Sequence, residues 1–213
     1  MEGLEAEHGE IIRFQKRAAE DEANVLCRIP EGRMDEDKVY KRIQELRALK
    51  RLAILEVARV ASLCLQNRKI KGALDVGTGN GIFAEAFVGL GLDVTGIDIQ
   101  EPMLEAARKL VPGAHFELCS AEALPFTDCS FDLCFLGLIL HETSNPLQTI
   151  QEAHRVAAER VAVLEWPYKE QEMGPPLDHR LKAEDVLRQA AALGFSHTQA
   201  ISLEYLVLFL LDK

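Results

Sequence analysis

The spacing of the hydrophobic positions changes near residue 71. Before residue 66, apolar residues recur three and four positions apart, which predicts amphipathic helices with a break at residues 28–33, where Pro30 and Gly32 stand. One packed helix face is expected to hold Val39, Ile43, Leu46, Leu49 and Leu52. Beyond residue 71 the apolar residues gather in short runs that are typical of strands.

Strands and helices are predicted to alternate along residues 71–213. The strands are expected at 72–76, 93–98, 115–119, 131–137, 160–165, 195–202 and 204–211, and the helices near 80–90, 101–111, 145–158 and 180–193. Because a helical crossover joins parallel strands, this alternation predicts a doubly wound, mostly parallel α/β sheet of seven strands. The last two strands leave no room for a helix between them, so the last strand is expected to be antiparallel. We expect one domain over residues 1–213, with 1–70 as an N-terminal helical lid on an α/β core of 71–213.

The charge is concentrated in the predicted core. The chain has a formal net charge of −10; residues 1–70 hold 14 Lys/Arg and 13 Asp/Glu (+1), and residues 71–213 hold 10 and 21 (−11). An acidic surface repels a phosphate backbone, so this distribution disfavours nucleic acid and favours a small-molecule substrate. The acidic first residues and the lack of a long apolar run favour a cytoplasmic protein with no membrane partner. No Cys-x-x-Cys pair occurs and no metal site is expected; a monomer and a homodimer stay equally open.

The segment ALDVGTGNGI (residues 73–82) places three glycines between a predicted strand and a predicted helix. Glycine lets the backbone approach a ligand, and a helix N-terminus offers unpaired N–H groups. Such a turn alone is compatible with a dinucleotide, a phosphate, a sulfonium cofactor or no ligand. The dinucleotide pattern, however, requires Gly or Ala where Ile82 stands. Asp75 would repel a pyrophosphate and attract the ammonium group of a methionine moiety.

Asp98 ends the next predicted strand, 17 residues after Gly81. A carboxylate there can accept hydrogen bonds from both hydroxyls of a ribose. The alternative interpretation is a helix N-cap.

Further motifs follow in a characteristic order. After LDVGTGNG come GIDIQ, AEALPF and FDLCFLGLILHE, and a late helix ends in Ala-Leu-Gly-Phe195. Together they resemble the class I S-adenosylmethionine-dependent methyltransferases, and within them the small-molecule branch that includes the quinone C-methyltransferases. The resemblance covers about residues 71–195. It implies a Rossmann-like fold, S-adenosylmethionine as cofactor, S-adenosylhomocysteine as product, and methyl transfer to a small acceptor.

The resemblance also implies a cofactor site. The residues concerned are Asp75, Gly77, Thr78, Gly79 and Gly81 around the methionine end, Asp98 at the ribose, Ile99 against the adenine, Ala121, Glu122 and Ala123 near the adenine amino group, and Leu138 beside the cofactor. Glu122 stands where the family more often has Asp, and its extra methylene can turn the carboxylate away.

His141 follows the fourth predicted strand, at the end of the sheet where α/β folds open onto their ligands. Its ordinary pKa near 6.5 suits a general base, and the alternative is a loop histidine that bonds locally. Glu165, Trp166 and Tyr168 are expected at the same end, where the aromatic pair can wall a planar substrate or cover the core. His179 and Arg180 can face a polar substrate or start a helix.

Three other functions remain open from the sequence. The first is a regulatory protein that binds the cofactor without turnover. The second, an NAD-dependent oxidoreductase, is disfavoured by Ile82 and Asp75. The third, an RNA methyltransferase, is disfavoured by the acidic core.

Overall fold

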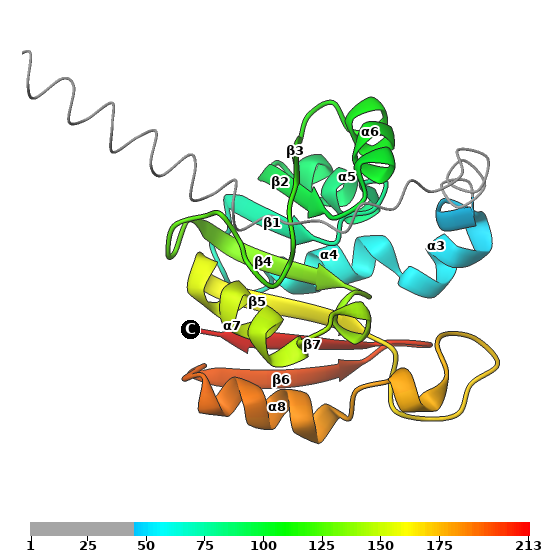
Figure 1. The fold of residues 1–213 in the computed structure, drawn as a ribbon, viewed down its shortest axis with the longest axis vertical. Helices are drawn as coiled ribbons and strands as arrows, with labels where there is room; N and C mark the ends of the chain where they lie inside the picture. Colours follow the sequence, from blue (N-terminus) through cyan, green and yellow to red (C-terminus); the bar gives the residue numbers. More distant parts are fainter. Residues whose placement is uncertain (1–44) are drawn as a thin grey trace, which may run out of the picture. The chain divides into compact units, whose positions relative to one another are not determined.

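The computed structural model describes residues 45–213, which form a seven-stranded sheet with helices on both faces (Figure 1). The strand order is β3-β2-β1-β4-β5-β7-β6, and β7 runs antiparallel to both of its neighbours while the other pairs are parallel. The strands are β1 (Gly72–Val76), β2 (Asp93–Asp98), β3 (His115–Leu118), β4 (Phe131–Gly137), β5 (Ala157–Glu165), β6 (His197–Ser202) and β7 (Val207–Asp212). The predicted doubly wound sheet with an antiparallel last strand is confirmed.

The described helices comprise two before β1 and four in the connections between strands. They are α3 (Leu49–Leu55), α4 (Val57–Leu65), α5 (Ile82–Gly89), α6 (Glu101–Leu110), α7 (Pro146–Val156) and α8 (Ala183–Ala192), with short 3-10 turns η1 (Leu140–Glu142) and η2 (Leu177–His179). Because parallel crossovers are right-handed, α5 and α6 cover one face of the sheet, and α7 and α8 cover the other. Among residues 45–213 no helix is both long and apolar enough to cross a membrane.

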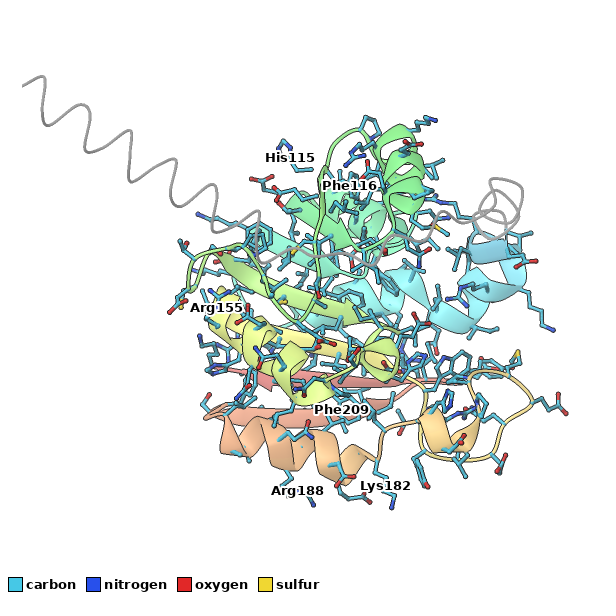
Figure 2. The ribbon with its side chains drawn as sticks, in the orientation of Figure 1. His115, Phe116, Arg155, Lys182, Arg188 and Phe209 are labelled. Carbon is cyan, nitrogen blue, oxygen red and sulfur yellow. The ribbon has the colours of Figure 1, made fainter. Side chains whose placement is uncertain are left out.

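The core lies between the sheet and its helices. Phe83 and Phe87 of α5 pack on Phe135 of β4, with ring centroids 4.6 and 5.4 Å apart. Phe209 of β7 is buried, whereas Figure 2 shows Lys182 and Arg188, on the α8 side, pointing away from the sheet. Because these aromatic side chains are buried, nearly all of their apolar surface is removed from water, and this stabilises the fold.

Strand β5 begins three residues earlier than expected. Helix α7 ends at Val156 and the chain enters β5 at once, with Ala157 already extended at φ −77° and ψ 138°. The added residues pair with the start of β4, where Phe131 faces Ala157 and the register then shifts before Leu133. A bulge of this kind lets one strand carry an extra residue.

The predicted continuous helix before residue 66 is wrong for its described members. Ala48 is extended, at ψ 138°, and Glu56 adopts a left-handed conformation at φ 46°, so the helix is broken twice. Leu46 and Leu49 therefore lie on either side of a break, and Leu49 is 86% exposed. A spacing of three and four defines one face only while the helix is continuous. Val39, Ile43 and the expected break at 28–33 lie outside the described residues.

Candidate active site

The glycine turn lies at the point where the strand order reverses. The chain proceeds from β1 outward to β3 and returns to β4 beside β1, and open α/β sheets bind ligands at such a switch point. The loops after β1 and β4 touch there: a Cβ placed on Gly77 would lie 2.6 Å from Ile139 Cγ2. The turn after β1 therefore packs directly on the loop that leads to His141.

The three glycines of the turn all have left-handed backbones, with φ of 69°, 55° and 80° at Gly77, Gly79 and Gly81. A Cβ on Gly81 would lie 3.0 Å from Val111 Cγ2, so Gly77 and Gly81 are crowded by protein. Gly79 differs, because the nearest atom to its Cβ position is Leu46 Cδ1 at 3.9 Å. Its backbone is thus accessible, as a cradle for a ligand requires.

Asp75 lies beneath the turn. Its side chain is 2% exposed, and its Oδ2 accepts hydrogen bonds from Thr78 Oγ1 at 2.6 Å and Ala84 N at 3.1 Å. Burial raises the pKa of Asp75 to about 6, against the effect of these two donors. In this structure Asp75 and Thr78 brace the turn and the first turn of α5.

Asp98 connects the glycine turn with the loop after β2. Its Oδ2 accepts from Gly79 N and its Oδ1 from Gln100 N, both at 2.9 Å. Burial raises its pKa, these N–H donors oppose the rise, and the charge of Glu142 adds to it. The backbone N–H of Ile99 also acts on Asp98, and a carboxylate offers about four acceptor sites, so Asp98 can accept from a ribose hydroxyl as well. Beside it, Ile99 is an exposed apolar side chain, available to an adenine ring.

The segment after β3 carries the other predicted adenine contacts. Ala121 is buried and Ala123 half-buried, and Glu122 Oε1 accepts from Asn145 N at the start of α7, at 3.0 Å. The Glu122 carboxylate is therefore engaged with α7, in line with the reach of its extra methylene.

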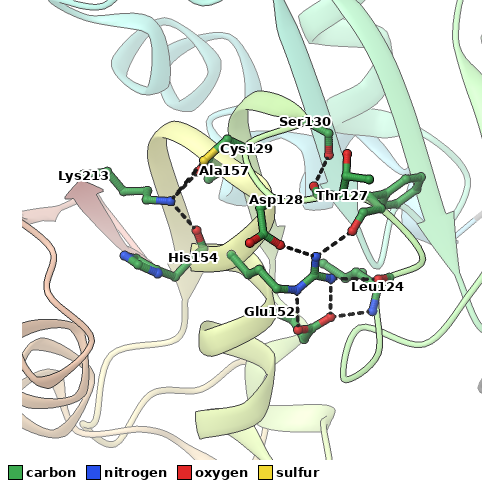
Figure 3. Close-up of polar contacts among 11 residues, drawn as sticks. Leu124, Thr127, Asp128, Cys129, Ser130, Glu152, His154, Ala157 and Lys213 are labelled. Atoms are coloured by element: carbon green, nitrogen blue, oxygen red, sulfur yellow. Dashed lines mark hydrogen bonds and ion pairs between the residues drawn. The ribbon is translucent and has the colours of Figure 1, made fainter.

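Arg155 of α7 fixes the far half of this segment, and Figure 3 labels three of its partners, Leu124, Asp128 and Glu152. Its guanidinium donates to Leu124 O at 2.8 Å, to Phe126 O at 2.6 Å and to the carboxylates of Asp128 and Glu152. Glu152 in turn accepts from Leu124 N at 2.8 Å. These bonds hold the loop that begins with Ala121, Glu122 and Ala123.

Leu138 follows β4 with a left-handed backbone, φ 59°, which is uncommon for a bulky residue. It is buried, and its N–H donates to Leu164 O at 2.9 Å. Such a conformation persists only where neighbouring structure holds it, and it turns the chain toward η1.

His141 in η1 meets Glu165 at the end of β5. Its Nδ1 lies 2.8 Å from Glu165 Oε2, and its backbone N donates to Oε1 at 3.2 Å. Burial acts to lower the pKa of His141, but the hydrogen bond to Glu165 and the charges of Glu165 and Glu142 outweigh burial and raise it. The ring is therefore held by a carboxylate, as in a histidine that handles protons.

Arg180 braces the loop after β5. Its guanidinium donates to the carbonyl oxygens of Pro167, Lys169, Met173 and Pro175 and lies 5.6 Å from the Trp166 ring. Trp166 is buried and Tyr168 is 45% exposed, so Tyr168 is the ring of this pair that solvent reaches, with Lys182 Nζ 5.2 Å from its centroid. This placement fits the interpretation that Trp166 covers the hydrophobic core. His179 is exposed in η2.

The residues just before α3 reach the glycine turn. Arg47 donates to Asn80 O at 3.0 Å and forms an ion pair with Glu85 of α5 at 2.7 Å. With Leu46 facing Gly79, this segment contacts both the turn and the helix after it. No sequence pattern indicates these contacts, because Arg47 stands among other basic residues.

The structure thus brings most of the predicted residues to one end of the sheet. The pairing that sequence reasoning missed is His141 with Glu165, although Glu165 was expected at the same end of the sheet. The sequence signal for Glu165 was its place as an acid at the end of the otherwise apolar run VAVLE, a place like that of Asp98 at the end of β2.

Comparison with known proteins agrees with this geometry. A family profile described as "Methyltransferase domain" matches residues 74–163. The chain is 34% identical over 110 residues to malonyl-[acyl-carrier protein] O-methyltransferase of Erwinia billingiae, covering 52% of this chain and 42% of that protein. It is 32% identical over 126 residues to demethylmenaquinone methyltransferase of Chlorobaculum parvum, covering 56% of this chain and 52% of that one. The chain thus spans about half the length of these curated relatives.

Among solved structures, the crystal structure of a SAM-dependent methyltransferase from Aquifex aeolicus superposes with a TM-score of 0.70 at 24% identity, covering 84% of this chain and 99% of that one. At this identity the likeness concerns the fold. Residues 74–163 thus match the profile described as a methyltransferase domain, and the chain shares the fold of the Aquifex aeolicus structure.

Proposed function

We propose that this chain transfers a methyl group from S-adenosylmethionine to a small-molecule acceptor. The observation that carries the proposal is the accessible backbone of Gly79, bonded to Asp98 at the switch point of the sheet. The matched methyltransferase domain spans the same residues, and the two curated relatives are named as methyltransferases of malonyl-[acyl-carrier protein] and of demethylmenaquinone.

The residues present fit this cofactor. Gly79 leaves space where a Cβ would stand, Asp98 keeps lone pairs for ribose hydroxyls, and Ile99 presents an apolar surface. Asp75, Gly77, Thr78 and Gly81 shape the turn, and the remaining contacts are assigned to Ala121, Glu122, Ala123 and Leu138. When bound, the cofactor supplies a methyl group already activated on a positively charged sulfur.

His141 is the proposed catalytic residue. Its Nδ1 is engaged with Glu165, so Nε2 is the atom that can take a proton from an acceptor. Alignment of the acceptor is the other requirement, and the η1 turn lies beside the glycine turn through the Gly77–Ile139 contact.

We also propose the role expected from the sequence for residues 1–70, that of a lid. The contacts of Leu46 with the Gly79 position and of Arg47 with Asn80 O support this role for residues 45–47. A lid that touches the turn would exclude water from the bound cofactor.

The acceptor is proposed to be a small molecule rather than nucleic acid, as the −11 charge of residues 71–213 favours. A monomer or homodimer, and a cytoplasmic location, stay predictions from the sequence.

A turnover assay tests the proposal. The protein is incubated with S-adenosylmethionine and a panel of hydroxyl, amine, thiol, carboxylate and activated-carbon acceptors, and release of S-adenosylhomocysteine is measured. We expect release that depends on one acceptor class. Binding of the cofactor without turnover of any acceptor would favour the regulatory alternative.

A further inference from the structure

The Glu165 carboxylate is held by three donors. It is 2% exposed at the end of β5, and it accepts from the backbone N of His141 and of Trp166, each at 3.2 Å. The third donor is His141 Nδ1, at 3.0 Å from Oε1 and 2.8 Å from Oε2. Two backbone donors fix the carboxylate plane, so the orientation of the imidazole follows from the orientation of Glu165.

Few charged groups surround the pair formed by His141 and Glu165, called here the His141–Glu165 pair. Among residues 45–213, the only cationic partner within ion-pair distance of Glu165 is His141, whose side chain is 9% exposed. Glu142 Oε1 lies 3.9 Å from His141 Nε2 on the opposite side of the ring, and its side chain is 62% exposed. Arg180 acts on His141 through its charge, while its guanidinium donates to loop carbonyls and to Gln171.

We propose that Glu165 is a positioning residue that keeps the His141 proton on Nδ1 and leaves Nε2 as a base, and that the acceptor is an uncharged group with a proton on the atom to be methylated. This inference rests on the proposed methyl transfer. An ionised Glu165 can only accept hydrogen bonds, so Nδ1 must be the donor. A neutral imidazole protonated on Nδ1 has its lone pair on Nε2.

The charge balance favours an uncharged acceptor. With His141 neutral the pair carries −1, which offsets the +1 of the sulfonium. During transfer the acceptor's proton moves to Nε2 and its freed electron pair forms the new bond to carbon, while the electrons of the broken S–C bond stay on sulfur. The His141–Glu165 pair and the sulfur both become neutral, so the transfer creates no net charge in a site where both side chains of the pair are largely buried. A carboxylate acceptor needs no base, and it would be repelled by the pair.

The rival arrangement makes the opposite prediction for pH. If protonated His141 bound an anionic acceptor through Nε2–H, kcat/KM would fall as pH rises above the pKa of His141. If His141 is the base, kcat/KM falls as pH drops below that pKa, because the protonated ring cannot accept a proton.

The first experiment needs no turnover. Nitrogen-15 NMR of histidine-labelled protein reports the tautomer and titration of each ring, and His141→Gln identifies the His141 signals. We expect the Nδ1–H tautomer with its pKa above 6.5 in the wild type. In Glu165→Gln the pKa should fall, because the charge of Glu165 no longer opposes the effect of burial and only that of Glu142 is left to do so. Glu142→Gln is the matched control: it removes a charge from the other side of the same ring and should leave the tautomer unchanged.

The second experiment measures activity. Glu165→Gln should lower kcat on the order of 10²-fold and move the acidic limb of kcat/KM to lower pH, and Glu165→Asp should restore part of the rate. Cofactor affinity should not change in either variant.

The outcomes separate the two proposals. An Nε2–H tautomer in the wild type, or a His141 titration unmoved by Glu165→Gln, would overturn the positioning role. Turnover of carboxylates only, or a rate that falls with rising pH, would overturn the acceptor class. If no acceptor is methylated, the proposed function fails and the acceptor class with it, while the NMR result still decides the role of Glu165.

Discussion

The buried or half-buried acids on the β1–β2 side and on the β4–β5 side of the candidate site accept hydrogen bonds from different kinds of donor. At the carboxyl ends of β1 and β2, Asp75 and Asp98 accept from backbone N–H groups and one hydroxyl. At the ends of β4 and β5, Glu165 accepts from a histidine ring as well as from the backbone. The donors on the first side are therefore groups that do not titrate near neutrality, whereas one donor on the second side, the histidine ring, does.

This difference assigns a task to each side. Carboxylates bound to backbone N–H groups fix the shape of the glycine turn and keep lone pairs for a ligand. A carboxylate bound to an imidazole sets the state of a proton. Changes on the β1–β2 side should thus alter cofactor affinity, and changes on the β4–β5 side should alter turnover.

The largest effect is expected at His141. His141→Ala should lower kcat by roughly 10²–10⁴-fold and leave cofactor affinity nearly unchanged, because the lost group handles a proton and does not hold the cofactor. The wild-type rate should fall on the acid side of the raised pKa of His141, and this limb should vanish in the variant. Steady-state kinetics against pH, with calorimetry of cofactor binding, checks both. An unaltered kcat and pH profile would place the chemistry elsewhere.

The pair Gly77→Ala and Gly79→Ala separates folding from binding within the glycine turn. Each places a side chain at positive φ, which costs about 1–2 kcal/mol of unfolding free energy. Gly77→Ala adds an overlap with Ile139, worth about 1–3 kcal/mol more. Gly79→Ala meets nothing closer than 3.9 Å in the protein and should instead weaken cofactor binding. Equal cofactor affinity in wild type and Gly79→Ala would contradict the assignment of Gly79 to the cofactor.

Asp98→Ala should weaken cofactor binding by roughly 1.5–3 kcal/mol, the usual contribution of hydrogen bonds to a charged group. The variant should fold, since Asp98 is half-buried at a strand end. Asp98→Asn, which keeps one acceptor oxygen, should lose less. If the folded Asp98→Ala variant binds the cofactor with wild-type affinity, then Asp98 only holds the loop after β2 and does not bind the cofactor.

The smallest effect is expected at Arg47. Its ion pair with Glu85 is partly exposed, so Arg47→Gln should cost about 0.2–1 kcal/mol of stability. A further few-fold loss of cofactor affinity is expected if residues 45–47 cover the turn. Arg59→Gln, which breaks an exposed pair with Glu56 away from the turn, is the control. Equal cofactor affinities in the two variants would argue against the lid.

The β1–β2 side could be predicted from the sequence because its signals are local. Strand, glycine turn and helix follow within the segment from Gly72 to Gly89, and Asp98 marks the end of the next strand. The β4–β5 side depends on a contact between His141 and Glu165, 24 positions apart, which no local pattern encodes. Likewise, the break at Glu56 uses a left-handed conformation without the glycine that usually marks one.

Cofactor selection tests the central claim most directly. Thermal unfolding is measured with S-adenosylmethionine, S-adenosylhomocysteine, NAD and FAD, because a ligand that binds only the native state must stabilise it. We predict that the two adenosyl ligands raise the melting temperature, with about 2.7 kcal/mol of added stability at a hundred times the dissociation constant. Stabilisation by NAD, with none from the adenosyl ligands, would contradict the account.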